Sequence, residues 1–321
     1  MALAPAPNLA RSAEVVGAPP AALPLGRPAP FARRARNAMV YAARALAEAW
    51  RTFRAARRGD RFGLAAALLR MRAKHFLWKL SPRFQFRTES ILGWTLDCFD
   101  YYEMISTFEI IFLAREYAFS PRSSSPRIVD CGSNIGLSLL FFKREYPEST
   151  ILAFEPDPET FSLLRRNVER NALPGVALEN LALSGKPGTR ELFCDSGRAG
   201  STAMSLLPGC GLDLRKTVQC ALLSDFIHED VDLLKLDIEG AELEVIEDLV
   251  RTGKIRHVRR MVIEYHPALF SDRDGYSWLR ETLNANGFEC QLRSGTPVPF
   301  GSPAPHPVTL FASRPTPSAT T

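Results

Sequence analysis

The chain has 321 residues, 46% of them apolar, and a formal net charge of +5, which is an ordinary balance for a globular protein. This length suits one large α/β domain with extensions, or two small domains. No apolar run approaches the roughly 18 residues of a membrane span, the Pro-rich start lacks the apolar region of a secretory signal, and the six cysteines show no metal-ligand spacing. We therefore expect a cytoplasmic protein with free thiols.

The first 80 residues differ in composition from the rest. Residues 1–30 are rich in Ala and Pro, and we expect them to be disordered. Residues 31–80 hold 13 Lys and Arg but only two acidic residues. Their apolar residues recur at three- and four-residue spacing, which predicts a basic amphipathic helix, a break at Gly59-Asp60 and a second helix over 62–80.

Two interpretations of these basic helices stay open. They form either an arm that packs on the main domain, or a surface that touches the inner face of an anionic membrane peripherally. Nucleic acid is not expected as a partner, because no binding motif accompanies the charge. We expect the basic extension to cover 31–100, the main domain 101–313, and a disordered tail 314–321.

The main domain alternates predicted strands with predicted helices after a first helix over 101–117. The strands lie near 127–130, 150–154, 176–181, 233–236, 260–264, 288–292 and 308–312. The helices lie near 136–145, 158–171, 241–251 and 276–286. The Gly-punctuated stretch 185–211 predicts a hairpin and a surface loop, followed by a strand-like segment over 217–221. This alternation predicts a Rossmann-like α/β fold whose ligands bind beyond the carboxyl ends of parallel strands.

A glycine-containing loop follows the first strand of this pattern, and an acidic residue follows the second. The loop is Asp130-Cys131-Gly132-Ser133-Asn134-Ile135-Gly136, and the acid is Glu155. A carboxylate at that place accepts two hydrogen bonds from a ribose diol, although capping of the helix near Pro158 is an alternative role. Asp130 suits a cofactor with a positively charged amino-acid moiety and would repel a pyrophosphate. The pattern therefore favours S-adenosylmethionine.

Further acids and a histidine end the later strands. Asp237 and Glu239 follow the strand 233–236, and Glu264 and His266 end the next one. The carboxyl ends of parallel strands share one edge of the sheet, so these side chains are expected in the same crevice as Asp130.

Several motifs, taken in order, resemble the FkbM family of S-adenosylmethionine-dependent methyltransferases over residues 105–312. They are Asp130-x-Gly-x-Asn-x-Gly, the run 153–158, Leu163 with Asn167 and Asn171, the run 182–184, the run 234–242, and Glu264-Tyr265-His266. The resemblance implies a class I methyltransferase fold: a mostly parallel seven-stranded sheet with an antiparallel last strand. It also implies transfer of a methyl group to a hydroxyl of a sugar, glycan or secondary metabolite.

The resemblance also implies the cofactor contacts. Asp130, Gly132, Asn134 and Gly136 would surround the methionine part, Glu155 would hold the ribose hydroxyls, and Ala182 and Leu183 would border the adenine. Many class I enzymes offer an acid to the adenine amino group where this chain has Leu181. In this chain, backbone groups or the Ser184 side chain would make the contact with the adenine instead.

Methyl transfer to a hydroxyl needs alignment with the sulfonium methyl group and a base for the departing proton. We predict that Asp237, Glu239 and His266 line this site, and that His266 or Glu239 accepts the proton; a structural role for His266 stays open. We predict no metal, although Asp237, Glu264 and His266 would be the ligands of a divalent ion that lowered the pKa of the hydroxyl. The rival functions are a nicotinamide-dependent oxidoreductase, which fits Asp130 poorly, and a non-catalytic nucleoside-binding or membrane-associated module.

Overall fold

The structure, a computed structural model, describes residues 31–55, 59–81, 83–194, 204–207, 213–266, 274–292 and 308–315, with side chains from residue 39 onward. The chain divides into two compact units, Met1–Arg44 and Ala45–Thr321. The predicted disorder of residues 1–30, and of residues 316–321 of the predicted tail 314–321, lies outside the described residues. Arg314, at the start of that tail, is instead fixed, because its amide donates to the Arg259 carbonyl and its side chain donates to three further carbonyls. Of the first unit, the structure describes the helical residues 31–44.

A seven-stranded sheet forms the centre of the second unit. Its strands are β3 (Arg127–Cys131), β4 (Thr150–Phe154), β5 (Val176–Glu179), β9 (Leu233–Leu236), β10 (Arg260–Tyr265), β11 (Glu289–Leu292) and β12 (Val308–Ser313). Their order is β11-β12-β10-β9-β3-β4-β5. β12 lies antiparallel to both of its neighbours, and the pairs among β10, β9, β3, β4 and β5 are parallel. The predicted sheet, with its antiparallel last strand, is confirmed.

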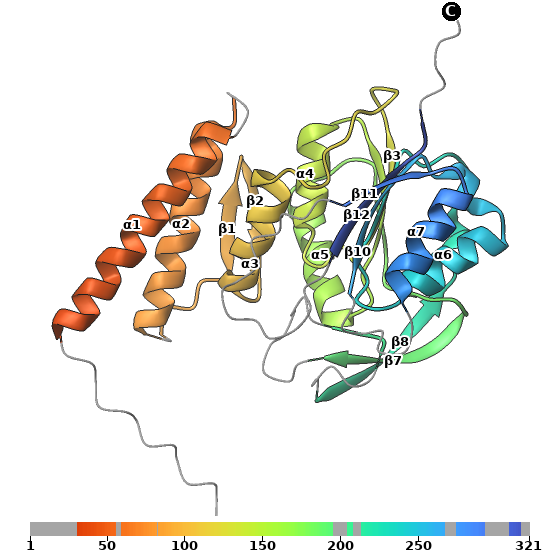
Figure 1. Ribbon diagram of the computed structural model, residues 1–321. Coiled ribbons are helices and arrows are strands. Elements are labelled where there is room, and N and C mark those ends of the chain that lie inside the picture. Colours follow the sequence, from red (N-terminus) through yellow and green to blue (C-terminus); the bar gives the residue numbers. More distant parts are fainter. Residues whose placement is uncertain are drawn as a thin grey trace, which may run out of the picture. The chain divides into compact units, whose positions relative to one another are not determined.

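Helices cover both faces of this sheet. They are α4 (Leu137–Glu145) and α5 (Pro158–Arg170) on one face, and α6 (Glu242–Arg251) and α7 (Gly275–Ala285) on the other (Figure 1). The alternation of β-strand side chains explains this arrangement, because Ile128 belongs to the hydrophobic cluster of α4 and α5, and Val129 to that of α6 and α7. The four predicted helices are confirmed to within one residue at each end.

The predicted helix over 101–117 is shorter than expected. It consists of α3 (Tyr101–Phe108) and a π-helical turn, η1 (Glu109–Leu113). The chain leaves the helix at Arg115, which has a left-handed φ of 55°. The Arg115 guanidinium donates to both carboxylate oxygens of Glu145, at 2.7 and 2.6 Å. This bidentate pair joins residues 30 positions apart and holds the turn at Arg115 in place. Local periodicity does not reveal such a contact.

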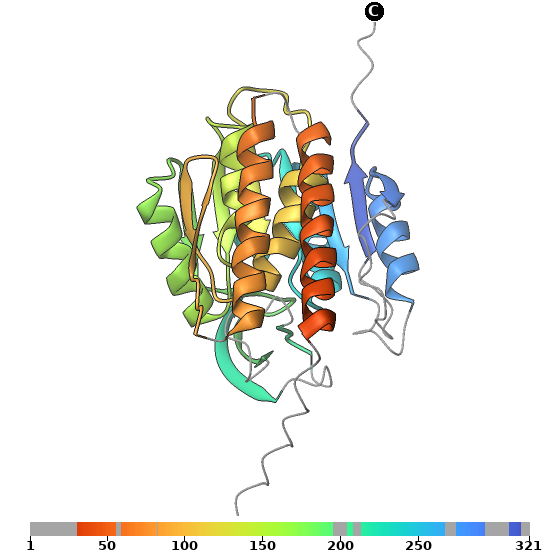
Figure 2. The same ribbon diagram turned by 90° about the vertical axis from the view of Figure 1, so that its left-hand side faces the viewer.

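The basic extension contains α1 (Phe31–Ala55), α2 (Arg61–Leu80) and a hairpin of β1 (Thr88–Ile91) and β2 (Trp94–Asp97). Both helices are confirmed. The hairpin, which the sequence pattern did not indicate, lies beside α2 (Figures 1 and 2). The Asn167 side chain accepts from the Asp97 amide at 2.8 Å and donates to its carbonyl at 3.0 Å. These bonds hold the hairpin against α5. In addition, apolar side chains of α2 and the hairpin belong to the same hydrophobic cluster as those of α3, α4 and α5.

A second, smaller sheet follows β5 in the chain. It contains β6 (Ala182–Leu183), β7 (Gly188–Cys194) and β8 (Leu214–Ala221), in the order β6-β8-β7. The hairpin predicted within 185–211 is wider than expected: β7 pairs with β8, which contains the strand-like segment expected over 217–221. Residues 195–203 and 208–212, between β7 and β8, lie outside the described residues. Two short 3-10 helices, η2 (Leu223–Phe226) and η3 (Lys254–His257), complete the elements. No helix in the described ranges is long and apolar enough to cross a bilayer, and the cysteines described there are free.

Candidate cofactor and active site

A cavity of about 1060 Å³ opens at the carboxyl ends of β3, β4, β9 and β10. Predicted site residues from five separate segments line it: Gly132, Asn134, Glu155, Ala182, Leu183, Asp237, Glu239 and His266. Glu264 lines it as well. The cavity therefore brings together residues up to 134 positions apart in the sequence, as expected for the crevice of an α/β sheet.

The glycine loop turns sharply between β3 and α4. Gly132, Asn134 and Gly136 all have positive φ, of 81°, 48° and 94°. The amides of Gly132 and Ser133 both donate to the Phe154 carbonyl, at 3.0 and 2.9 Å. These bonds tie the loop to the end of β4, which carries the predicted ribose acid. Gly136 supplies the left-handed residue before α4 and is not among the described residues that line the cavity.

Glu155 is buried, and its carboxylate is fixed by two backbone amides. One oxygen accepts from the Asn134 amide at 2.9 Å, and the other from the Asp157 amide at 3.0 Å. Burial is the main cause that raises the pKa of Glu155 to about 7. Asp157, not Glu155, caps α5, because its carboxylate accepts from the Thr160 amide. The alternative capping role is therefore wrong, and both Glu155 oxygens keep acceptor capacity toward the cavity.

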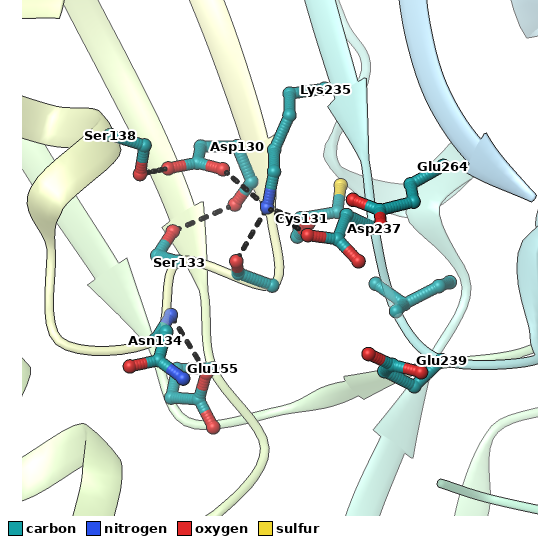
Figure 3. Close-up of polar contacts among 12 residues, drawn as sticks. Asp130, Cys131, Ser133, Asn134, Ser138, Glu155, Lys235, Asp237, Glu239 and Glu264 are labelled. Carbon is teal, nitrogen blue, oxygen red and sulfur yellow. Dashed lines mark hydrogen bonds and ion pairs between the residues drawn. The ribbon is translucent and has the colours of Figure 1, made fainter. Parts of the chain in front are cut away.

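Asp130 is fully buried and is not among the described residues that line the cavity. Ser138 donates to one of its carboxylate oxygens at 2.5 Å, and the Lys235 ammonium lies 3.5 Å from the other (Figure 3). The Asp130 carboxylate is thus already paired with a cation from β9. The structure places it behind the loop, where it supports the residues that line the cavity.

Lys235 on β9 is a site residue that the sequence analysis did not identify. Its ammonium donates to the Gly132 carbonyl at 2.6 Å and to the Cys131 carbonyl at 3.2 Å, and it lies 3.3 Å from Asp237 (Figure 3). Although burial lowers the pKa of Lys235, the charges of Asp237 and Asp130 raise it well above the ordinary value. The sequence did contain a signal for this role, namely a lysine within an apolar strand. A buried ammonium group needs a charged partner, so a nearby carboxylate could have been expected.

The expected adenine end is apolar. Leu181, Ala182 and Leu183 line the cavity there. Ser184 is buried, and its hydroxyl donates to the Lys186 carbonyl at 2.7 Å. Ser184 is not among the described residues that line the cavity, so of the two predicted adenine contacts the geometry favours the backbone.

His266 lies among carboxylates from two strand ends. Its Nε2 lies 3.2 Å from Glu239 and 3.9 Å from Glu264, and its Nδ1 lies 3.4 Å from Glu242. Glu242 also accepts from the amides of Ile238 and Gly240, which braces the turn that carries Glu239 in a left-handed conformation (φ 55°). Glu242 therefore links the turn that carries Glu239 to His266.

The charges of this cluster shift its pKa values. Burial lowers the pKa of His266, but the contact with Glu242 and the charge of Glu239 outweigh it and raise this pKa to about 10. Burial is the main cause that raises the pKa of Glu264 to about 8 and that of Glu239 well above its ordinary value. His266 is therefore an imidazolium at neutral pH, and an imidazolium cannot accept a proton.

Three ligand atoms of this cluster are close enough together to hold a metal ion. They belong to Asp237, Glu239 and His266 and lie within 4.8 Å of one another. The sequence analysis named Asp237, Glu264 and His266 as the alternative metal ligands. The structure instead groups Glu239 with Asp237 and His266. The same carboxylates are already balanced by the His266 imidazolium and by Lys235.

The cavity continues from this cluster along α3 and η1. Its lining there is mixed. Apolar side chains come from Met104, Ile105, Ile110, Ile111 and Leu113, and polar ones from Glu103, Ser106, Thr107 and Glu109. From α1 and α2, Glu48, Arg51, Thr52 and Arg72 also contribute. Arg72 joins the wall by ion pairs to Glu48 at 2.9 Å and Glu109 at 2.6 Å. Sequence periodicity predicted an apolar helix here, but only the packing shows which of its side chains face the cavity.

Comparison with known proteins agrees with this geometry. Residues 130–290 match the family model described as the methyltransferase FkbM domain. The chain is 34% identical over 203 residues to methyltransferase sdnD of Sordaria araneosa, which covers 51% of this chain and 77% of that protein. It is 34% identical over 160 residues to methyltransferase 1 of Beauveria bassiana (43% of this chain, 64% of that protein).

It is also 30% identical over 172 residues to the 31-O-demethyl-FK506 methyltransferase FkbM of Streptomyces tacrolimicus. That alignment covers 43% of this chain and 65% of that protein, so this chain spans just under two thirds of two of these three relatives. The matched region holds the glycine loop, Glu155 and the acidic cluster, and with the sheet order it shows that the chain belongs to the FkbM family of methyltransferases.

Proposed function

We propose that this chain is an S-adenosylmethionine-dependent O-methyltransferase that acts on a hydroxyl of a sugar, glycan or secondary metabolite. The observation that carries the proposal is the cavity itself, because it joins a ribose-binding carboxylate, Glu155, to an acidic cluster through one continuous space. Glu155 fits the ribose of a nucleoside, and the acidic cluster fits proton transfer.

The residues present fit this cofactor. Glu155 is held by two amides and keeps acceptor capacity for the two ribose hydroxyls. Asp237, Glu239 and Glu264 give the cavity an acidic lining that suits a sulfonium and an ammonium group. A dinucleotide would bring a pyrophosphate, which these acids disfavour, so the oxidoreductase alternative has less support.

When bound, the cofactor supplies an electrophilic methyl group on a positively charged sulfur. In the proposed reaction the acceptor oxygen forms a bond to this carbon, the carbon–sulfur bond breaks with its electron pair moving to sulfur, and the hydroxyl proton goes to a base. Because a sugar or alcohol hydroxyl is weakly acidic, the base acts as the new bond forms. The task of the chain is to align the two reactants and to place that base.

Of the two predicted bases, Glu239 suits this task better than His266. Burial raises the pKa of Glu239 well above its ordinary value, which makes its ionised carboxylate a stronger base than an exposed one. His266 lies 3.2 Å from Glu239 and acts in the proposal as a cation that positions the carboxylate. Asp237, held near Lys235 at 3.3 Å, faces the same space.

The acceptor is proposed to occupy the part of the cavity along α3 and η1. Apolar residues line it, and the π-helical turn η1 contributes three of them, Ile110, Ile111 and Leu113. Such turns are frequent at functional sites. One relative is named for methylation at an oxygen atom, which supports a hydroxyl as the acceptor group.

Calorimetry with S-adenosylhomocysteine and NAD, followed by labelled methyl transfer into cell extracts, tests this proposal. We expect binding of S-adenosylhomocysteine, no binding of NAD, and label in one hydroxyl-bearing fraction. Glu239→Gln should lower turnover at least roughly tenfold, which is about 1.4 kcal/mol of barrier, with little change in S-adenosylhomocysteine affinity.

The exposed Glu247→Gln on α6 is the matched control and should transfer methyl normally. Absence of S-adenosylhomocysteine binding at millimolar concentration would overturn the cofactor assignment. Full turnover in Glu239→Gln would overturn only the choice of base.

A further inference from the structure

Exposed apolar side chains of the second unit are concentrated near its start. Ten large apolar residues of Ala45–Thr321 are exposed among the described residues, and seven of them lie between residues 46 and 84. They are Leu46, Trp50, Phe62, Leu77, Trp78, Leu80 and Phe84. Scattered single apolar residues need no explanation, but a concentration of this kind marks an interaction surface.

Four of the side chains near the α1–α2 turn form what we call the aromatic patch: Leu46, Trp50, Phe53 and Phe62. Trp50 stacks on Phe53 with ring centroids 5.7 Å apart, and Phe53 meets Phe62 edge to face at 4.9 Å. Leu46 lies one helical turn before Trp50 on α1. Leu46, Trp50 and Phe62 are 61%, 60% and 78% exposed, so the patch is apolar and open to solvent.

Basic residues lie near this patch, in the sequence and, for Arg61, in space. Arg51 and Arg54 lie beside Trp50 in the sequence, and the Arg61 guanidinium lies 5.7 Å from the centre of the Phe53 ring. Residues 45–84 contain ten Lys and Arg but only Glu48 and Asp60 as acids. Both acids already pair with arginines, Glu48 with Arg72 and Asp60 with Arg144. The surface is therefore strongly positive as well as apolar.

We propose that the aromatic patch docks on an anionic lipid bilayer. Aromatic side chains favour the interface between headgroups and acyl chains, and each Lys or Arg near an anionic surface adds electrostatic attraction. A second copy of the chain is a poorer occupant, because pairing two such patches would bring arginine against arginine. In this proposal the positive charge of residues 45–84 favours an anionic membrane surface, and the aromatic side chains of the patch insert into the bilayer. This inference does not rest on the chemistry of methyl transfer.

Vesicle co-sedimentation of the full chain tests the proposal. The probes are vesicles of phosphatidylcholine and vesicles of phosphatidylcholine mixed with phosphatidylglycerol. We expect binding to the mixed vesicles that weakens with added salt, with a blue shift of tryptophan fluorescence. The double variant Leu46→Ser with Trp50→Ser should bind at least about tenfold more weakly, since two large apolar side chains no longer enter the bilayer.

The matched control is Leu292→Ser, which removes an equally simple apolar residue, 52% exposed, from β11. It should bind as the parent chain does. Phe62→Ser provides a second patch variant if the double variant melts earlier than the parent. Equal binding to neutral and mixed vesicles, equal loss in Leu292→Ser, or a dimer that the patch variants dissociate would each overturn the proposal.

Discussion

The backbone of Gly132 lies against the carbonyl of Asp237 so closely that a Cβ atom on Gly132 would be 1.8 Å from that oxygen. The contact joins the loop after β3 to the residue after β9, which are adjacent parallel strands. Gly132 also has a φ of 81°, which an L side chain rarely adopts. A glycine here is required by the packing of two backbones as well as by its own conformation.

Gly132→Ala should therefore destabilise the protein by more than about 3 kcal/mol, because a backbone atom must move in addition to the unfavourable φ. Gly93→Ala is the control. Gly93 has a φ of 94°, but its Cβ would meet no described heavy atom within 4 Å, so its cost should be about 1 kcal/mol. Urea unfolding of both variants measures the difference. Equal costs would mean that φ alone, and not the contact with Asp237, decides the effect.

Lys235→Met should destabilise the protein by about 3 to 5 kcal/mol, because it leaves the buried Asp130 carboxylate without its cation. Adding Asp130→Asn to this variant removes the uncompensated charge and should recover part of the loss. The exposed Lys186→Met is the control and should change the free energy of unfolding by less than about 0.5 kcal/mol. A double variant no more stable than Lys235→Met would argue against the charge as the cause.

Glu155→Gln should weaken S-adenosylhomocysteine binding at pH 8, above the raised Glu155 pKa of about 7, because an ionised acceptor of two ribose hydroxyls becomes a neutral amide. Hydrogen bonds to a charged group are worth about 1.5 to 3 kcal/mol, so we expect a loss of roughly 10- to 100-fold by calorimetry. Glu169→Gln makes the same chemical change at an exposed position of the following helix, α5, and should bind normally. Unchanged affinity in Glu155→Gln would remove the ribose role.

The charge of His266 should make stability depend on pH in a defined window. Its pKa is raised from 6.5 to about 10 in the folded protein by Glu242 and Glu239, against the effect of burial. A raised folded pKa means that this stabilisation is complete below about pH 6.5 and is lost as the pH rises through about 10. The stability difference between the parent and His266→Gln should therefore shrink between pH 6.5 and 10, by roughly 4 kcal/mol.

Urea unfolding at pH 6.5, 8 and 10 measures this difference. The half-buried His257, which pairs with Asp230 at 3.1 Å, provides the control substitution His257→Gln. A parent–variant difference for His266 that does not change with pH would show that the imidazole is neutral in the folded protein.

Much of the fold was predictable from the sequence. The order and bounds of strands β3, β4, β9 and β10 followed from short apolar runs that end on acids, and the helices followed from apolar periodicity. The hairpin β1–β2 was not predictable in this way, because its strands have four residues each. Asn167 and Asn171 hold it by side-chain bonds to the backbone of Thr95 and Asp97, which local patterns do not reveal.

The residues of the site were predictable as a set, but their roles were not. The sequence by itself determined that Glu155, Asp237, Glu239 and His266 meet at one edge of the sheet, because parallel strands bring their carboxyl ends together. Only the tertiary structure decided that Asp130 faces Lys235 behind the loop and that Glu242 and Glu239 raise the pKa of His266. Both outcomes depend on burial and on charges within about 4 Å, and side chains from distant segments acquire such neighbours only when the chain folds.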